Sequence, residues 1–259
     1  MRILDCESVD STFTSLEIIT GVHCNEIREF LINLDLNKIK EKANYNSSEL
    51  NDEILNEFKS TFNPNLEYDY VCWFHLTRTY EDNDYEDGLL PINEVKNKIW
   101  DFLFNLIKDD LTEYQWLQFR KDFENETLNN PEANWRAYLY KINTAKSFPS
   151  PHGYLIKEVG LDEGKDHYLK HPEIVMHIGH AIQSTFNIDI INRFQTSTNP
   201  CIVKFRSKNT KLIYIADALY YLHNKLLNEQ FTMNSNNCFD GVGKKIDHED
   251  IIEIKYINI

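Results

Sequence analysis

The chain has few cysteines, and they are not arranged to hold a fold together. Its 259 residues include five cysteines, an odd number spread along the sequence with no C-x-x-C pair. A disulfide framework or a structural zinc ribbon needs paired, closely spaced cysteines. We therefore expect free thiols in a reducing, cytoplasmic compartment, with Cys72 and Cys201 buried in strands.

Basic charge is also scarce. Lys and Arg number 27 against 41 Asp and Glu, which gives a formal net charge of −14. This balance disfavours binding to nucleic-acid phosphates, which requires clustered Lys and Arg. No apolar stretch approaches the roughly 20 residues that span a bilayer, and the first residues lack the apolar core of a signal peptide. We therefore expect no membrane segment.

Helical periodicity dominates the first 145 residues. Apolar residues recur at helical spacing and several runs follow residues typical of N-caps. The predicted helices cover 24–42, 48–62 and 92–108, with one opening at Thr112 and one at Asn130-Pro131. Two more are predicted over 172–186, with Pro172 in the first position, and over 216–228.

Strand-like runs rich in β-branched and aromatic residues are concentrated later in the chain. The predicted strands are 68–79, 154–159, 201–206, 212–215 and 251–257. The predicted helices come early in the chain, and strands mixed with helices follow later. This order indicates an α+β protein rather than a regular βαβ alternation. We expect a helical N-terminal region over 1–66 and an α+β domain over 67–259, with a helical insertion at 92–145.

The strand ending in Phe74-His75-Leu76-Thr77-Arg78 is the segment most informative about function. Alternate residues of a strand share a face, so His75 and Thr77 point to the same side. Two polar groups at a strand end, followed by a loop at Gly88-Leu89, can form a cofactor-binding edge. On spacing alone, a solvent-facing strand end whose histidine makes a local hydrogen bond is the simpler interpretation.

This segment resembles the first strand of the ADP-ribosyltransferase-like superfamily, where an aromatic-His-x-Thr/Ser strand is followed by a loop and a Gly-Leu entry into a helix. The resemblance covers about twenty residues. It points to the branch of DNA- and protein-modifying toxins, RNA 2′-phosphotransferases and bacterial defence proteins. It implies a mixed or antiparallel sheet core of ADP-ribosyltransferase type. NAD would be the substrate, and its ADP-ribose would go to a macromolecular target of a bacterial toxin or anti-phage effector.

The resemblance also implies how NAD would be bound. His75 would hydrogen-bond the ribose or the nicotinamide amide, with Thr77 on the same face. Arg78 would meet the pyrophosphate, for which a planar guanidinium is suited. Tyr80 and Gly88 complete the implied NAD-binding set.

Members of the superfamily use an acidic residue near a late strand to stabilise positive charge as nicotinamide leaves. By position we choose Glu249 as this catalytic acid, with Asp240 and Glu229 as the other candidates. No Q-x-E or E-x-E pair is present. Besides Tyr80, Tyr154 is considered for stacking on nicotinamide.

A second set of polar residues lies on the helix predicted over 172–186. At 100° per residue Glu173, His177 and His180 fall on one side, a spacing that can supply three ligands to Zn²⁺ in a metal-dependent hydrolase. A further ligand would come from Asp166 or His167. A plain solvated helix face is the favoured interpretation.

The net charge supports another alternative, a non-enzymatic immunity or inhibitor protein. A charge of −14 favours steered association with a basic partner. In the transferase interpretation the same charge suits a protein target, or a cognate antitoxin with a basic face, better than bare DNA.

Overall fold

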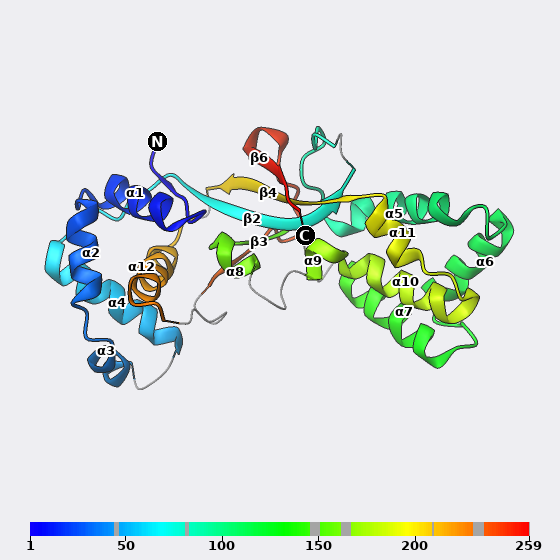
Figure 1. Cartoon of the computed structure of the whole chain (residues 1–259), viewed down its shortest axis with the longest axis horizontal. Coiled ribbons are helices and arrows are strands. Elements are labelled where there is room, and N and C mark those ends of the chain that lie inside the picture. The colour runs from blue at the N-terminus through cyan, green and yellow to red at the C-terminus, as the bar shows by residue number, and fades with distance from the viewer. Residues whose placement is uncertain are drawn as a thin grey trace. The chain divides into compact units, whose positions relative to one another are not determined.

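The computed structural model describes residues 1–43, 47–80, 83–145, 151–161, 167–208, 210–229 and 236–258. Over these residues the chain folds into twelve α-helices and a six-stranded sheet, which confirms the α+β class (Figure 1). Contacts between Cα atoms divide the chain into two compact units. Unit 1 comprises Met1–His75, Gly153–Glu163 and Lys204–Phe239, and unit 2 comprises Leu76–His152, Gly164–Val203 and Asp240–Ile259.

The sheet has the strand order β5-β3-β2-β4-β6, and β1 pairs with β2 outside this path. The strands are β1 (Ile3–Leu4), β2 (Tyr70–Thr79), β3 (His152–Tyr154), β4 (Asn199–Ser207), β5 (Cys238–Asp240) and β6 (Ile251–Tyr256). β1 runs parallel to β2, whereas β3 runs antiparallel to it. The sheet is therefore mixed.

Unit 1 is built around a helix that is covered on most of its surface. Its helices are α1 (Val9–Thr20), α2 (Cys24–Ile32), α3 (Leu36–Lys42), α4 (Ser47–Phe62), α8 (Lys157–Leu161) and α12 (Leu212–Leu227). α1, α2 and α4 all contact α12, ten of whose residues are buried (Figure 1). The fully buried Trp73 of β2 packs edge-on against Tyr214 of α12, with ring centroids 5.1 Å apart.

Unit 2 has an aromatic helical core. Its helices are α5 (Ile92–Ile107), α6 (Glu113–Glu124), α7 (Pro131–Thr144), α9 (His167–Lys170), α10 (Glu173–Phe186) and α11 (Ile190–Thr196). Trp100 of α5 is fully buried, and its ring lies within about 6 Å of the rings of Trp116, Phe123 and Tyr140. Its indole N–H also donates to the Tyr140 hydroxyl at 2.9 Å.

Local signals predicted several helix starts correctly. Thr112 and Gln115 form the expected capping box at the start of α6. Asn130 caps α7 through its side chain, with Pro131 in the first turn. The strands predicted over 68–79, 201–206 and 251–257 are present as β2, β4 and β6. Cys72 and Cys201 are buried in them, and all five cysteines are unpaired.

Three element predictions are wrong. The strand predicted over 212–215 is the first turn of α12, and the strand predicted over 154–159 ends at Tyr154, with α8 beginning at Lys157. The single helix predicted over 24–42 is two helices, because the side chain of Asp35 caps a new helix at the Lys38 N–H. Pro172 is the N-cap of α10 rather than its first helical residue.

The predicted boundary between residues 66 and 67 falls inside unit 1. The three helices expected over 92–145 are present as α5, α6 and α7 in unit 2, while the domain boundaries stay a prediction. No helix within the described ranges combines the length and apolarity needed to cross a bilayer. Asp166, considered above as a metal ligand, lies outside the described residues.

Candidate functional site

The end of β2 carries two partly exposed polar residues after a buried apolar stretch. Residues 71–74 are buried, whereas His75 and Thr77 retain some exposure. Strand geometry places these two side chains on the same face. Trp73, two residues earlier on this face, donates from its indole N–H to Ser207 Oγ at 2.9 Å.

Close packing surrounds this face within unit 1. Phe74 pairs with Tyr154 in the antiparallel register, so Gly153 lies opposite His75. A Cβ at Gly153 would lie 3.0 Å from the Phe205 ring and 3.1 Å from the Trp73 Cβ. Tyr154 shares the face of Phe74, which is opposite to the face of His75, and therefore does not lie next to the imidazole.

Arg78 is bound to protein oxygens. Its guanidinium donates to Leu169 O at 2.6 Å, Gln195 O at 2.7 Å, and Thr198 O and Oγ1 at 2.6 and 3.0 Å. Four of its five N–H groups are used in this way. A bidentate contact with a pyrophosphate would require at least one of these bonds to break. In the structure Arg78 joins β2 to α9, to the last turn of α11 and to the segment between α11 and β4.

Gly88 lies where the loop after β2 meets the C-terminal segment. It has φ +82°, and a Cβ on it would lie 2.0 Å from Ile246 O. The next residue, Leu89, exchanges two backbone hydrogen bonds with Ile246, each 2.9 Å long. Only glycine allows this positive φ and this close approach together.

Tyr80 lies at the end of β2 in unit 2 and is half exposed. Its ring packs edge-on against Phe102, with centroids 4.9 Å apart. The Tyr256 hydroxyl donates to its carbonyl at 3.0 Å, so β6 also contacts the end of β2.

Glu249 is exposed on a short 3₁₀ turn, His248–Asp250, directly before β6. His248 Nδ1 lies 3.0 Å from Tyr85 O, so this turn touches the same loop as Gly88. Asp240 accepts from the Val242 N–H at 2.8 Å, and the following residues form a turn. Glu229 is exposed just after α12.

The structure therefore brings part of the predicted set together. Gly88, Tyr80 and the turn bearing Glu249 belong to one connected region of unit 2, formed by the loop after β2 and the C-terminal segment. Arg78 lies in the same unit, but its guanidinium is bound to oxygens of Leu169, Gln195 and Thr198, outside this region. His75 belongs to unit 1, as the last residue before the division.

An ion-pair cluster in unit 1 was not predicted from the sequence. Lys204 is 9 % exposed and donates to Asp5 Oδ2 at 2.6 Å and Glu7 Oε2 at 2.8 Å. Lys157 donates to Glu7 Oε1 at 2.8 Å. Burial alone would raise the pKa of Glu7, but its bonds with Lys157 and Lys204 lower it to about 2. Two cations and two anions are neutralised internally, as in a structural cluster.

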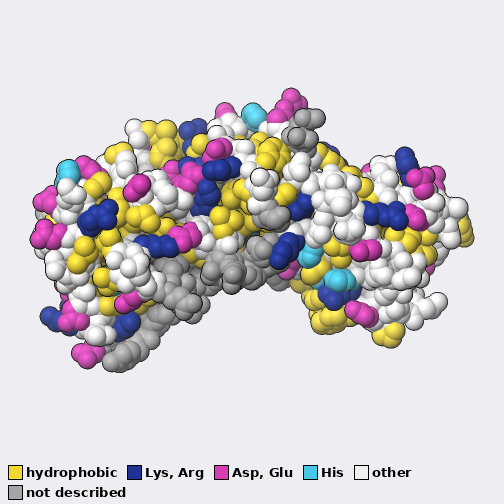
Figure 2. All heavy atoms as spheres, in the orientation of Figure 1, with side chains coloured by type: hydrophobic (Ala, Val, Ile, Leu, Met, Phe, Trp, Pro, Cys, Tyr) yellow, Lys and Arg dark blue, Asp and Glu magenta, His cyan; other side chains and the backbone are white. Residues whose placement is uncertain are grey.

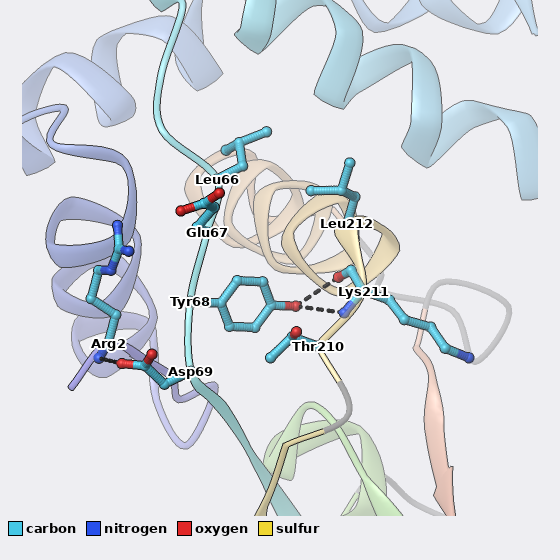
Figure 3. A pocket seen from close by; sticks show the side chains of 8 residues that line it. All are labelled: Arg2, Leu66, Glu67, Tyr68, Asp69, Thr210, Lys211 and Leu212. Atoms are coloured by element: carbon cyan, nitrogen blue, oxygen red, sulfur yellow. Dashed lines mark hydrogen bonds between the residues drawn. The ribbon is translucent and has the colours of Figure 1, made fainter.

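A shallow hollow of about 430 Å³ lies at the start of α12 in unit 1 (Figure 3). It is lined by Arg2, Leu66, Glu67, Tyr68, Asp69, Thr210, Lys211 and Leu212. The Tyr68 hydroxyl donates to Lys211 O at 2.6 Å and accepts from its N–H at 3.0 Å. The Lys211 ammonium points away from the Tyr68 ring (Figure 3).

The helix face considered for a metal is not plainly solvated. His177 is 3 % exposed because α7 packs along α10. The amide Nδ2 of Asn143 lies 3.1 Å from Glu173 Oε2 and 3.2 Å from His177 Nε2. These contacts use acceptor atoms that a metal would need. Among the described residues, no three His, Cys, Asp or Glu side chains are arranged to hold a metal ion.

Comparisons with known proteins identify no relative. A scan of protein-family models, a search of curated proteins and a search of solved structures each find no match to this chain.

Proposed function

We propose that the chain is a mono-ADP-ribosyltransferase that uses NAD and acts on a macromolecular target, as a bacterial toxin or anti-phage effector. The sequence resemblance around β2 carries the proposal. In the reaction the bond between the ribose C1′ and nicotinamide breaks, nicotinamide leaves as a neutral base, and an acceptor nucleophile on the target bonds to C1′ and releases its proton.

Two features of the fold support this proposal. The residues of the aromatic-His-x-Thr motif lie on a strand of a mixed sheet, with His75 and Thr77 partly exposed on one face. The glycine of the Gly-Leu element has a positive φ that only glycine adopts readily, and α5 begins four residues later at Ile92.

Each residue has a distinct role in the proposal. His75 and Thr77 bind the nicotinamide riboside portion by hydrogen bonds, and Gly88 shapes the loop that follows. Glu249 provides the carboxylate that stabilises the oxocarbenium-like charge on the ribose. Arg78 contributes to NAD binding only if a guanidinium bond to Leu169, Gln195 or Thr198 opens.

The test is transfer of label from NAD labelled in its ADP-ribose portion to proteins of a bacterial lysate. His75→Ala and Glu249→Gln should each reduce labelling at least about a hundredfold, in keeping with the loss of one group that stabilises charge in the transition state. His152→Ala and Glu253→Gln are the matched controls, since both change exposed residues of strands and should label as the wild type does.

Two results would count against the proposal. Absence of labelling by folded wild-type protein, in lysates from several bacterial hosts, would remove the activity. Equal labelling by the wild type and the Glu249→Gln variant would remove Glu249 as the catalytic acid.

A further inference from the structure

β6 of unit 2 lies at an edge of the sheet. It follows β4 at the end of the strand order, and no strand in the described part of the chain pairs with its outer edge (Figure 1). The Ile257 N–H donates to Pro200 O of β4 at 3.0 Å. Backbone groups of successive strand residues point to opposite edges. Those of Ile252 and Ile254 therefore point to the outer edge.

The side chains of β6 are exposed and follow a strict alternation. Ile252 is 48 % and Tyr256 39 % exposed, and the charged residues Glu253 and Lys255 are exposed as well. Alternate residues share a face of a strand, so the apolar side chains lie on one face and the two charged ones on the other. An exposed edge strand of this kind is a template for a further strand.

We propose that β6 pairs antiparallel with β6 of a second copy of this chain, about a two-fold axis at Ile254. A two-fold contact sets residue i opposite residue j and j opposite i. The pairing then sets Glu253 of each copy opposite Lys255 of the other. It also sets Ile252 of each copy opposite Tyr256 of the other. Opposite charges and aromatic–β-branched pairs both stabilise such a ladder.

The charges on β6 select one register. Residues opposite one another in an antiparallel pair direct their backbone groups either both toward the partner strand or both away from it. The two-fold axis can therefore move only from one residue to the next. An axis at Glu253 sets this carboxylate opposite its own copy, and an axis at Lys255 does the same for the ammonium. Like charges directly opposite one another are destabilising, so both shifts are disfavoured.

The strength of this contact is limited by its size and by net charge. It consists of one pair of six-residue strands, and the formal charge of −14 on each copy opposes association at long range. On the face shown in Figure 2, acidic and basic side chains are mixed rather than gathered into one patch. We therefore expect a weak, concentration-dependent dimer. The contact is independent of the proposed NAD chemistry, which uses neither Glu253 nor Lys255.

The test is sedimentation equilibrium of the full chain over a range of concentrations at physiological ionic strength. The wild type should dimerise reversibly. Glu253→Lys and Lys255→Glu should each weaken the dimer at least about tenfold, because each replaces two opposite-charge pairs with two like-charge pairs. An equal mixture of the two variants should associate about as tightly as the wild type, because each supplies the charge that the other lacks.

Lys121→Glu is the matched control, because it makes the same charge change as Lys255→Glu at an exposed position of α6. It should dimerise as the wild type does. A wild type that stays monomeric would overturn the proposal and leave the edge to a strand of a different protein. A mixture of Glu253→Lys and Lys255→Glu that associates no more than either variant alone would also overturn it, as would single variants that dimerise like the wild type.

Discussion

Asp217 of α12 has its carboxylate in a buried position within unit 1. Burial raises its pKa to about 6, and the hydrogen bonds from Asn237 and Asn51 offset only part of that effect. In the unfolded chain the ordinary pKa is 3.8. Between these values the folded state holds a proton that the unfolded state lacks, so stability falls as the pH rises.

Replacing this carboxylate should therefore change the pH dependence of folding. From pH 4 to 6.5 the free energy of unfolding of the wild type should fall by about 2 kcal/mol relative to that of Asp217→Asn, according to the shift in pKa. Urea unfolding of both proteins across this range measures the difference. If the unfolding free energies of the wild type and Asp217→Asn differed by the same amount at every pH, the raised pKa of Asp217 would be wrong.

Glu7→Gln should change the pH dependence of the unfolding free energy in the opposite direction and in a lower pH range. The pKa of Glu7 is about 2 in the fold and ordinarily 4.5. Its stabilising contribution is therefore present above pH 4.5 and is lost as the pH falls toward 2.

Gly88 and Gly21 form a matched pair for testing a close backbone approach. Both have a positive φ, +82° and +72°, but a Cβ at Gly21 meets nothing within 4 Å, whereas one at Gly88 would lie 2.0 Å from Ile246 O. Gly21→Ala should cost about 1 kcal/mol from the backbone alone. Gly88→Ala should cost about 2–4 kcal/mol, since the clash adds to the strain.

Thermal or urea unfolding measures both glycine variants. Equal losses of stability in Gly88→Ala and Gly21→Ala would show that Ile246 does not approach the loop as the structure describes.

At the scale of elements, Arg78 holds three segments of unit 2 together. Arg78→Lys keeps the charge but cannot reproduce the four bonds to the oxygens of Leu169, Gln195 and Thr198. We expect a loss of roughly 2–3 kcal/mol in unfolding free energy, together with faster amide exchange in residues 195–198.

Arg120→Lys is the control for Arg78→Lys. Arg120 forms an i, i+4 pair with Glu124 on α6, donates to Asn97 Oδ1 at 2.6 Å and lies over the Trp100 ring. These contacts are fewer and more exposed than those of Arg78, so we expect a loss of about 1 kcal/mol or less. If the two variants lost the same stability, the role of Arg78 as a link between elements would be wrong.

The starts of α6 and α7 were predictable from the sequence, whereas the first turn of α12 was not. α6 and α7 carry N-cap residues, so their starts follow from local sequence. The buried face of α6 follows from spacing as well, whereas α7 buries Ala133, Ala137 and Tyr140 and leaves Trp135 and Tyr138 exposed. The first turn of α12, Leu212-Ile213-Tyr214-Ile215, has the composition of a strand. Since α12 is buried on most sides, no helical alternation marks its first turn.

The candidate site shows a similar division. The strand that bears His75 and Thr77 was predictable from local sequence, and so was the turn at Gly88. Each depends only on residues that are neighbours in the chain. The bonds of Arg78 to Leu169 and Gln195, and the contact of Asn143 with His177, join residues far apart in the chain. No local spacing encodes such contacts.

At the scale of the whole molecule, the charge of −14 is distributed over 41 acidic and 27 basic residues. Because acidic residues are so common in this chain, finding one near a late strand is not informative by itself. The choice of Glu249 as the catalytic acid rests on the resemblance alone. On the proposed function, this charge suits a basic target surface, and we expect complex formation with such a target to weaken as salt rises.

The most direct test of the transferase proposal is calorimetric titration of NAD into the full chain. We predict saturable binding to the wild type, at least about tenfold weaker binding to His75→Ala through loss of a buried hydrogen bond, and unchanged binding to His152→Ala. No binding of NAD by folded wild-type protein at millimolar concentration, or equal affinity in all three proteins, would contradict it.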